Sequence, residues 1–333
     1  MKKLINAPAD LLSESLDGFV AAHHDLVALS ADRKFVRRKS MTKGKVGVIS
    51  GGGSGHEPLH AGFVGRGMLD AACPGHVFTS PTPDQILGAV EAADTGAGCL
   101  MIVKNYEGDV MNFEMGAEMA AETAGRKVLK VITDDDVAVE KSTYSIGRRG
   151  IAGTLVVEKI VGAAAEQGRD LAALQALGAQ VNAQTRSMGV ALTSCTVPSA
   201  GKPTFEIGDD EMEMGVGIHG EPGRRRAKLA KADAIAEEML TAILPELSLK
   251  TGAACLLFVN GFGGTPAIEL YVVVRAAQRI LDGKGVKVAR YLTGSYVTSL
   301  EMAGCSITVT ALDDELTKLW DAPVHTPALR WGV

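Results

Sequence analysis

The stretch from Lys45 to His60 reads "KVGVISGGGSGHEPLH". Its apolar first part, residues 45–50, predicts a buried β-strand, and the glycines that follow predict a loop in which the backbone approaches a ligand closely. Three interpretations of this loop are open at the outset. It wraps a phosphate, it binds zinc through the pattern H-E-x-x-H at 56–60, or it holds a small polar molecule on which His56 acts as an acid or base.

Strands and helices alternate along the sequence around this stretch. A helix is predicted over residues 9–29, and apolar runs at 98–105 and 127–133 predict further buried strands. Thr82-Pro83-Asp84 predicts a helix start, and residues 111–125 predict a helix that ends at Gly125. This alternation is typical of a parallel α/β sheet.

A second series of elements follows. Helices are predicted at 151–167, 170–185, 227–244 and 265–283, and strands at 187–198, 252–260, 286–293 and 305–311, with a strand, turn and strand over 205–220. A chain of 333 residues is long enough for two domains. We therefore predict two α/β domains: residues 1–186, with a mainly parallel sheet flanked by helices, and residues 187–333, a smaller domain with a mixed sheet.

Composition narrows the functional classes. The net charge of −5 argues against nucleic-acid binding, and the short run Arg224-Arg225-Arg226 predicts a solvated loop. Five cysteines without a C-x-x-C pair are typical of a reducing compartment. The N-terminal lysines are not followed by the apolar core of a signal peptide, and no apolar run approaches the roughly 18 residues of a membrane span. We expect a cytoplasmic protein with no nucleic-acid or membrane partner.

The zinc and phosphate interpretations of the glycine-rich stretch both require features that the sequence lacks. A zinc site of this pattern needs both histidines on one helix face, but Pro58 would cost about 3 kcal/mol in a helix interior. A P-loop needs a lysine in G-x-x-x-x-G-K-[ST], and this loop has none. The fingerprint G-x-G-x-x-G occurs at 215–220, but Glu221-Pro222 follows and no helix is predicted there. The sequence therefore predicts neither a metal nor a nucleotide site.

A polar cluster is the interpretation that remains. Ser54 and His56 follow one predicted strand, Lys104 and Asp109 follow another, and ligands of open α/β sheets bind at such strand ends. The cluster could bind a small hydroxylated molecule and move a proton. Alternatively, Lys104 and Asp109 form a structural ion pair and His56 caps a helix. His219, between glycines in "GVGIHGEPG", is either a structural histidine or a nucleophile that a ligand can approach.

Several motifs, in order, resemble those of one family. They are "GGGSGHEP", "ACPGHVFTSPTPDQI", "VKNYEGDVMNFE", "DDDVAVE", "GRRGIAGTLVVEKIVGAAAE", "TVPSAGKP", "EMGVGIHGEPG" and "WDAPVHTPALRWG". Together they resemble the dihydroxyacetone-binding subunits of dihydroxyacetone kinases over the whole chain. The resemblance implies a two-domain α/β protomer that forms a homodimer and acts as a phosphotransferase on an alcohol group.

The resemblance also implies residue roles. His219 would add to the ketone carbon of the substrate and form a hemiaminal. His56 and Asp109 would bind the substrate hydroxyls and accept protons, and Gly53, Ser54, Gly55 and Lys104 would complete the binding site. Only a carbonyl compound can form such an adduct, so glycerol would be excluded by chemistry.

The expected partners follow from the same resemblance. The chain stops at "RWGV", where the ketone-binding half of the family ends, which predicts a stand-alone subunit that binds no cofactor itself. ADP or ATP with Mg²⁺ would sit on a separate helical subunit. A phosphotransferase-system phosphocarrier would recharge that subunit from phosphoenolpyruvate, or ATP would be the donor. A related ketose such as erythrulose as substrate, and a non-catalytic role as a ketose sensor, remain alternatives.

Overall fold

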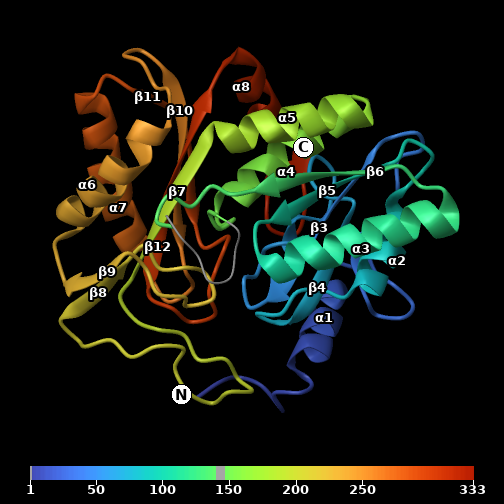
Figure 1. The fold of residues 1–333 in the computed structure, drawn as a ribbon, viewed down its shortest axis with the longest axis horizontal. Coiled ribbons are helices and arrows are strands. Elements are labelled where there is room, and N and C mark those ends of the chain that lie inside the picture. Colours follow the sequence, from blue (N-terminus) through green and yellow to red (C-terminus); the bar gives the residue numbers. More distant parts are fainter. Residues whose placement is uncertain (1, 140–146) are drawn as a thin grey trace. The chain divides into compact units, whose positions relative to one another are not determined.

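The computed structural model describes residues 2–139 and 147–333 of the chain (Figure 1). They form two compact units: the N-terminal unit, residues 2–133, 154–180 and 318–333, and the C-terminal unit, residues 134–139, 147–153 and 181–317. Each unit contains a six-stranded sheet with helices, so the predicted fold class of two α/β parts is confirmed. The predicted domain boundary at residue 186 lies close to residues 180–181, where the chain passes from the N-terminal to the C-terminal unit. Whether the two parts fold independently of each other stays a prediction.

The N-terminal unit is built on a sheet in the strand order β1-β2-β4-β3-β5-β6. The strands are β1 (Val27–Leu29), β2 (Val36–Arg38), β3 (Gly47–Ser54), β4 (Ala71–Val77), β5 (Cys99–Lys104) and β6 (Val128–Thr133). Strands β4, β3, β5 and β6 pair in parallel, and β1 and β2 add an antiparallel edge. Strands β3, β5 and β6 confirm the predicted strands at 45–50, 98–105 and 127–133, whereas β2 and β4 have no predicted counterpart. The predicted helix over residues 9–29 is wrong in its last part, because the helix ends at Ala22 and residues 27–29 form β1.

Strand β3 continues through the glycines that the sequence predicts to be a loop. All of its residues are buried, and 49–54 pair with β4. A Cβ on Gly51 would lie 2.6 Å from the carbonyl oxygen of Cys73, and a Cβ on Gly53 would lie 2.6 Å from the backbone nitrogen of Thr79. The glycines thus permit close approach of neighbouring backbone, and the chain leaves the strand only at Gly55, where φ is 103°.

Helices pack on the sheet of the N-terminal unit or lead from one unit to the other. They are α1 (Leu11–Ala22), η1 (Ala61–Phe63, a 3₁₀ turn), α2 (Pro83–Ala93), α3 (Glu107–Ala124), α4 (Gly153–Glu166) and α5 (Leu171–Ala183). Pro83 in the first turn of α2 and the left-handed Gly125 at the end of α3 confirm the predicted helix ends. Ile86 of α2 and Phe113 of α3 are buried in one hydrophobic core with Met101 of β5.

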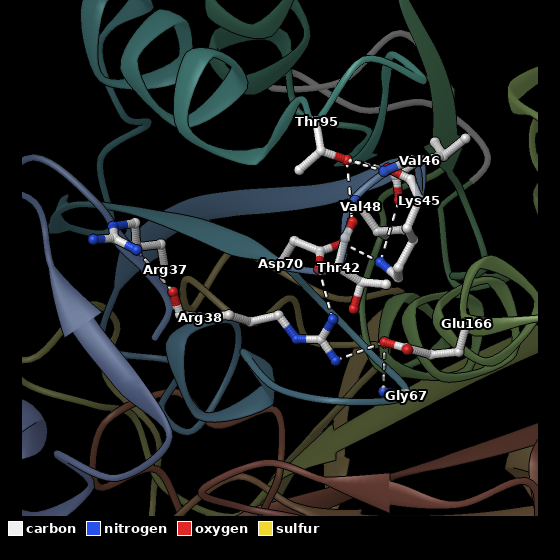
Figure 2. A network of polar contacts seen from close by, with 11 residues as sticks. Arg37, Arg38, Thr42, Lys45, Val46, Val48, Gly67, Asp70, Thr95 and Glu166 are labelled. Carbon is white, nitrogen blue, oxygen red and sulfur yellow. Dashed lines mark hydrogen bonds and ion pairs between the residues drawn. The ribbon is translucent and has the colours of Figure 1, made fainter. Parts of the chain in front are cut away.

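A buried network of charges surrounds Asp70, directly before β4 (Figure 2). Its carboxylate accepts from Arg38 Nη1 at 2.8 Å and from the backbone N–H of Val48 at 2.8 Å, and it also pairs with the ammonium of Lys45. Arg38 Nη2 reaches Glu166 Oε1 of α4 at 2.6 Å. Two cations and two carboxylates therefore compensate one another and join strand β2 to α4.

The C-terminal unit contains a mixed sheet, as predicted, in the order β11-β10-β12-β7-β8-β9. The strands are β7 (Thr185–Ala191), β8 (Glu211–Met214), β9 (Arg225–Lys228), β10 (Ala254–Gly261), β11 (Lys287–Gly294) and β12 (Gly304–Leu312). Only β10 and β11 pair in parallel. Helices α6 (Ala232–Ile243) and α7 (Ala267–Gly283) share a buried core with this sheet. This unit also contains η2 (Leu244–Glu246), and α8 (Asp314–Asp321) leads from it to β13 (Val324–His325) and β14 (Arg330–Trp331), which belong to the N-terminal unit.

Two predictions in the C-terminal unit are wrong in detail. The segment 205–220 contains one strand, β8, and not two. Its pairing partner is β9, which contains Arg225 and Arg226, so most of the arginine run is an edge strand and not a loop. Cross-strand pairing, which local composition does not reveal, decides both cases. No helix within residues 2–139 and 147–333 combines the length and apolar character that crossing a membrane requires.

Candidate functional site

Lys104 and Asp109 are placed by the connection between β5 and α3. Lys104 ends β5, and Asp109 lies in the first turn of α3, where the unpaired N–H groups and the dipole of a helix favour a carboxylate. Both side chains are buried, and Lys104 Nζ lies 3.6 Å from Asp109 Oδ2. The other oxygen, Asp109 Oδ1, is buried without a hydrogen-bond partner in the described part of the chain. The pair thus leaves one carboxylate oxygen unused at the carboxyl edge of the sheet.

The Lys104 ammonium is held mainly by neutral acceptors. It donates to His60 Nε2 at 2.9 Å and to the carbonyl oxygen of Gly51 at 3.3 Å. A Cβ on Gly52 would lie 2.2 Å from Nζ. The glycine of β3 is therefore what makes room for the lysine head group.

His60 connects Lys104 to a second buried carboxyl group. Its Nδ1 lies 2.6 Å from Glu158 Oε1 of α4 and 2.9 Å from Ser50 Oγ. Burial lowers the pKa of His60 well below its usual range, and the charges of Lys104 and His56 lower it further. The imidazole is therefore neutral at physiological pH.

His56 is fully buried and stacks on Phe78, with ring centroids 5.0 Å apart and an interplanar angle of 17°. Phe78 has φ of 55°, a left-handed conformation that is rare and costly for a large side chain. The strained residue therefore fixes the plane of the histidine ring. The alternative that His56 caps a helix does not apply to η1, the next helical element, whose N-cap is His60.

The last residues of β3 and the following Gly55 make their polar contacts within the protein. Ser54 Oγ donates to the carbonyl oxygen of Gly75 at 2.7 Å, which ties the end of β3 to β4. The backbone N–H of Gly55 lies 2.9 Å from Glu57 Oε2. Gly53 is covered by the backbone of Phe78 and Thr79. Any ligand contact of Ser54 would therefore use the lone pairs of its hydroxyl or its backbone.

His219 belongs to the C-terminal unit, in the turn that follows β8. Its Nδ1 lies 3.0 Å from Glu221 Oε1, and its backbone N–H donates to Glu221 Oε2 at 3.0 Å. Burial by itself would raise the pKa of Glu221, but His219 and Arg149 outweigh burial and lower it to about 2. An ionised Glu221 accepts a hydrogen bond from Nδ1–H, and in that tautomer the lone pair of the ring is on Nε2.

The glycines beside His219 have a structural reason. A Cβ on Gly217 would lie 1.9 Å from Glu221 Oε2, and a Cβ on Gly220 would lie 2.4 Å from Thr204 Oγ1. Gly220 also has φ of 76°. The glycines therefore allow the carboxylate to fold back onto the histidine.

The structure brings most of the predicted site residues into one neighbourhood. Gly53, Ser54, Gly55, His56, Lys104 and Asp109 lie in the N-terminal unit, and His219 lies in the C-terminal unit. The predicted alternative of a Lys104–Asp109 ion pair is also realised. Among residues 2–139 and 147–333, no three His, Cys, Asp or Glu side chains are grouped as a metal site requires.

Three further residues at these sites have no role in the sequence prediction. His60 appeared only in the zinc pattern, and Glu221 only inside the motif of His219. A histidine and a glutamate two residues apart between glycines is a signal that could have identified Glu221. Glu158 has no local signal, because it reaches His60 from 98 residues away.

Comparison with known proteins identifies relatives over nearly the whole chain. The family model of the Dak1 domain matches residues 17–328. The chain is 51% identical to a Listeria innocua protein named "PTS-dependent dihydroxyacetone kinase 1, dihydroxyacetone-binding subunit DhaK", covering 95% of each chain.

Two solved structures are similar in fold and sequence. The dihydroxyacetone kinase of C. freundii superposes with a TM-score of 0.90 and 35% identity, over 99% of this chain and 60% of that one. The "dihydroxyacetone kinase operon co-activator Dha-DhaQ" superposes with a TM-score of 0.89 and 32% identity, over 95% of this chain and 97% of that one.

Proposed function

Because this chain belongs to the Dak1 domain family, we propose that it is the dihydroxyacetone-binding subunit of a PTS-dependent dihydroxyacetone kinase. The observation that carries the proposal is the pairing of His219 Nδ1 with Glu221 at 3.0 Å. A proton held on Nδ1 by this contact leaves a lone pair on Nε2, and that tautomer is the form that can attack a ketone.

The proposed covalent step is an addition. His219 Nε2 forms a bond to the ketone carbon of dihydroxyacetone and the carbonyl π electrons move to oxygen, which takes up a proton from water. The ring, now cationic, gives its Nδ1 proton back to solvent, and the product is a neutral hemiaminal with the mass of the whole ketone. Positive charge that develops on the ring faces the Glu221 carboxylate, whose low pKa keeps it ionised. Capture of this kind fixes the substrate and removes part of the entropic cost of the following step.

The N-terminal unit supplies the groups for phosphoryl transfer in this proposal. Asp109 Oδ1, buried without a hydrogen-bond partner in the described residues, is an acceptor for a substrate hydroxyl. The proton of this substrate hydroxyl would pass to Asp109 or His56 as the hydroxyl oxygen forms a bond to phosphorus. The bond between phosphorus and the donor breaks in the same step. Lys104 Nζ lies 3.6 Å from the other oxygen, Asp109 Oδ2, so the ion pair orients the carboxylate.

The phosphoryl donor would come from another subunit. We propose that ADP or ATP with Mg²⁺ is bound by a helical partner, that a phosphocarrier of the phosphotransferase system recharges it, and that this chain is a homodimer. Size-exclusion chromatography with light scattering tests the dimer, and a monomer at micromolar concentration would contradict it.

Native mass spectrometry with dihydroxyacetone tests the covalent step. We expect an adduct with the mass of the whole ketone and no loss of water, and its absence with glycerol. His219→Ala should abolish the adduct, whereas His76→Ala, which alters an exposed histidine of β4, should retain it. Absence of an adduct on folded wild-type protein would refute the hemiaminal, and a parallel sample with erythrulose would show which ketose is preferred.

A non-catalytic ketose sensor is the second candidate, because the co-activator resembles this chain over nearly its full length. The buried Lys104–Asp109 pair favours catalysis, since capture of a ketone by His219 needs no general base. Mixing the chain with a nucleotide-binding subunit of a relative, ADP and the phosphotransferase proteins separates the two. Formation of dihydroxyacetone phosphate supports the kinase, and adduct formation without phosphorylation by any such subunit supports the sensor.

A further inference from the structure

His60, the second histidine of "HEPLH", lies between the buried ammonium of Lys104 and the buried carboxyl group of Glu158. Its Nε2 is 2.9 Å from Lys104 Nζ, and its Nδ1 is 2.6 Å from Glu158 Oε1. The exposed fractions of the Lys104 and Glu158 side chains are both 0%. A neutral ring therefore links a buried ammonium to a buried carboxyl group.

The position of the ring proton follows from these contacts. An ammonium has only N–H donors, so the nitrogen that it contacts must present a lone pair. His60 is neutral, since burial and the neighbouring charge of Lys104 both disfavour its protonated form. Its single proton is consequently on Nδ1, where it donates to Glu158. Ser50 Oγ is also near Nδ1, at 2.9 Å, and lies 2.7 Å from the carbonyl oxygen of Ile102.

The Lys104 ammonium has its shortest contact with His60. The other contacts are longer, 3.3 Å to the carbonyl oxygen of Gly51 and 3.6 Å to Asp109 Oδ2. Without the imidazole acceptor, a buried ammonium would move toward the remaining negative charge, which is Asp109. The place of Asp109 therefore depends on His60 through the lysine.

Burial of the Glu158 carboxyl group costs free energy that a purely structural role in α4 would not require. Burial raises the pKa of its carboxyl group, while the Ser50 hydroxyl and the Lys104 charge oppose that rise. Its second oxygen, Oε2, has no hydrogen-bond partner within residues 2–139 and 147–333. An apolar side chain would fill this position in α4 without that desolvation cost.

We propose that His60 and Glu158 are positioning residues that hold Lys104, and through it Asp109, in the arrangement needed for proton transfer from the substrate. The inference rests on the proposed kinase function. It assigns the chain Glu158–His60–Lys104–Asp109 a single task, namely to orient a buried ammonium that in turn positions the carboxylate of Asp109.

The first test is independent of catalysis. Ring ¹⁵N–¹H correlation spectra of ¹⁵N-histidine-labelled protein, assigned with His60→Gln, report which ring nitrogen carries the proton. We expect His60 to be neutral with its proton on Nδ1 at about pH 8 and to stay neutral well below the ordinary titration range of histidine. A proton on Nε2, or titration in the ordinary range of histidine, would overturn the inference.

The second test uses steady-state kinetics of the complex with a nucleotide-binding subunit. His60→Leu removes both contacts of the ring, and we expect kcat to fall roughly 100-fold with KM for dihydroxyacetone changed less than about threefold. His60→Gln keeps an acceptor for Lys104 and should recover about tenfold of the loss. Glu158→Gln should fall between wild type and His60→Leu.

Lys159→Met is the matched control. Lys159 is the next residue of α4, is equally buried, and donates to the carbonyl oxygen of Leu319 at 2.9 Å, outside this chain of contacts. We expect it to lower thermal stability while kcat stays within about twofold of wild type. An equal loss of kcat in Lys159→Met, or an unchanged kcat in folded His60→Leu, would overturn the inference.

Failure of the proposed function has a different signature. If wild-type protein makes no ketose phosphate with any nucleotide subunit, the kinase proposal is wrong, and the tautomer spectrum alone then decides whether His60 orients Lys104. If wild-type protein is active and the His60 variants are as active, the kinase proposal stands and the positioning role falls.

Discussion

Gly52→Ala inserts a methyl group directly against the Lys104 head group. The new Cβ would lie 2.2 Å from Nζ and 3.4 Å from His60 Nε2. Carbon and nitrogen need about 3.5 Å for an ordinary contact, so the ammonium would have to retreat by roughly 1 Å. That movement breaks the 2.9 Å hydrogen bond to His60 and shifts the ion pair with Asp109.

Two terms contribute to the expected loss of stability. A hydrogen bond made by a charged group contributes about 1.5–3 kcal/mol, and overpacking a buried site costs about 1–3 kcal/mol. We therefore expect Gly52→Ala to lower the free energy of unfolding by about 3–5 kcal/mol. A displacement of about 1 Å at a catalytic group also predicts a kcat reduced roughly 100-fold.

Urea unfolding and the reconstituted kinase assay measure the two effects separately. Gly178→Ala is a steric control, because its Cβ would lie 2.7 Å from Val131 Cγ2, a close contact in the same unit that involves no charge. It should lose only about 1–3 kcal/mol and keep kcat within about twofold. A folded Gly52→Ala protein with wild-type kcat would refute the reasoning. Catalysis would then not depend on the observed position of the Lys104 ammonium.

Three further predictions concern other buried groups. Asp70→Asn removes a negative charge that compensates two buried cations, so the free energy of unfolding should fall by about 3–5 kcal/mol while kcat per folded molecule stays unchanged. A loss below about 1 kcal/mol, measured by urea unfolding, would contradict this. The pKa of Glu221 is lowered from 4.5 to about 2, so its ionised form stabilises the folded state above about pH 4.5, and that stabilisation is lost as pH falls toward 2. Wild-type protein should lose on the order of 3 kcal/mol more than Glu221→Gln over this range in urea unfolding, and equal losses would disprove the link to His219. Phe78→Gly relieves a strained backbone but removes the ring stacked on His56, so kcat should fall roughly tenfold with little change in melting temperature, and an unchanged kcat would show that stacking is not needed.

Local patterns in the sequence predicted the elements that depend on neighbours along the chain. The apolar runs of β3, β5 and β6 and the helix ends at Pro83 and Gly125 reflect burial and backbone conformation of consecutive residues. The short strands β1, β2 and β4 were not predicted, because their conformation depends on pairing with other segments of the chain.

The candidate site divides in the same way. The motifs contain His56, Lys104, Asp109 and His219, and the chain by itself determined that these polar groups follow strands at the edge of an α/β sheet. Only the tertiary structure decided that the glycines of β3 are strand and make room for a lysine. It also decided that Glu158 reaches His60 across 98 residues. A contact of that kind depends on how helices pack on the sheet, and neither composition nor periodicity encodes it.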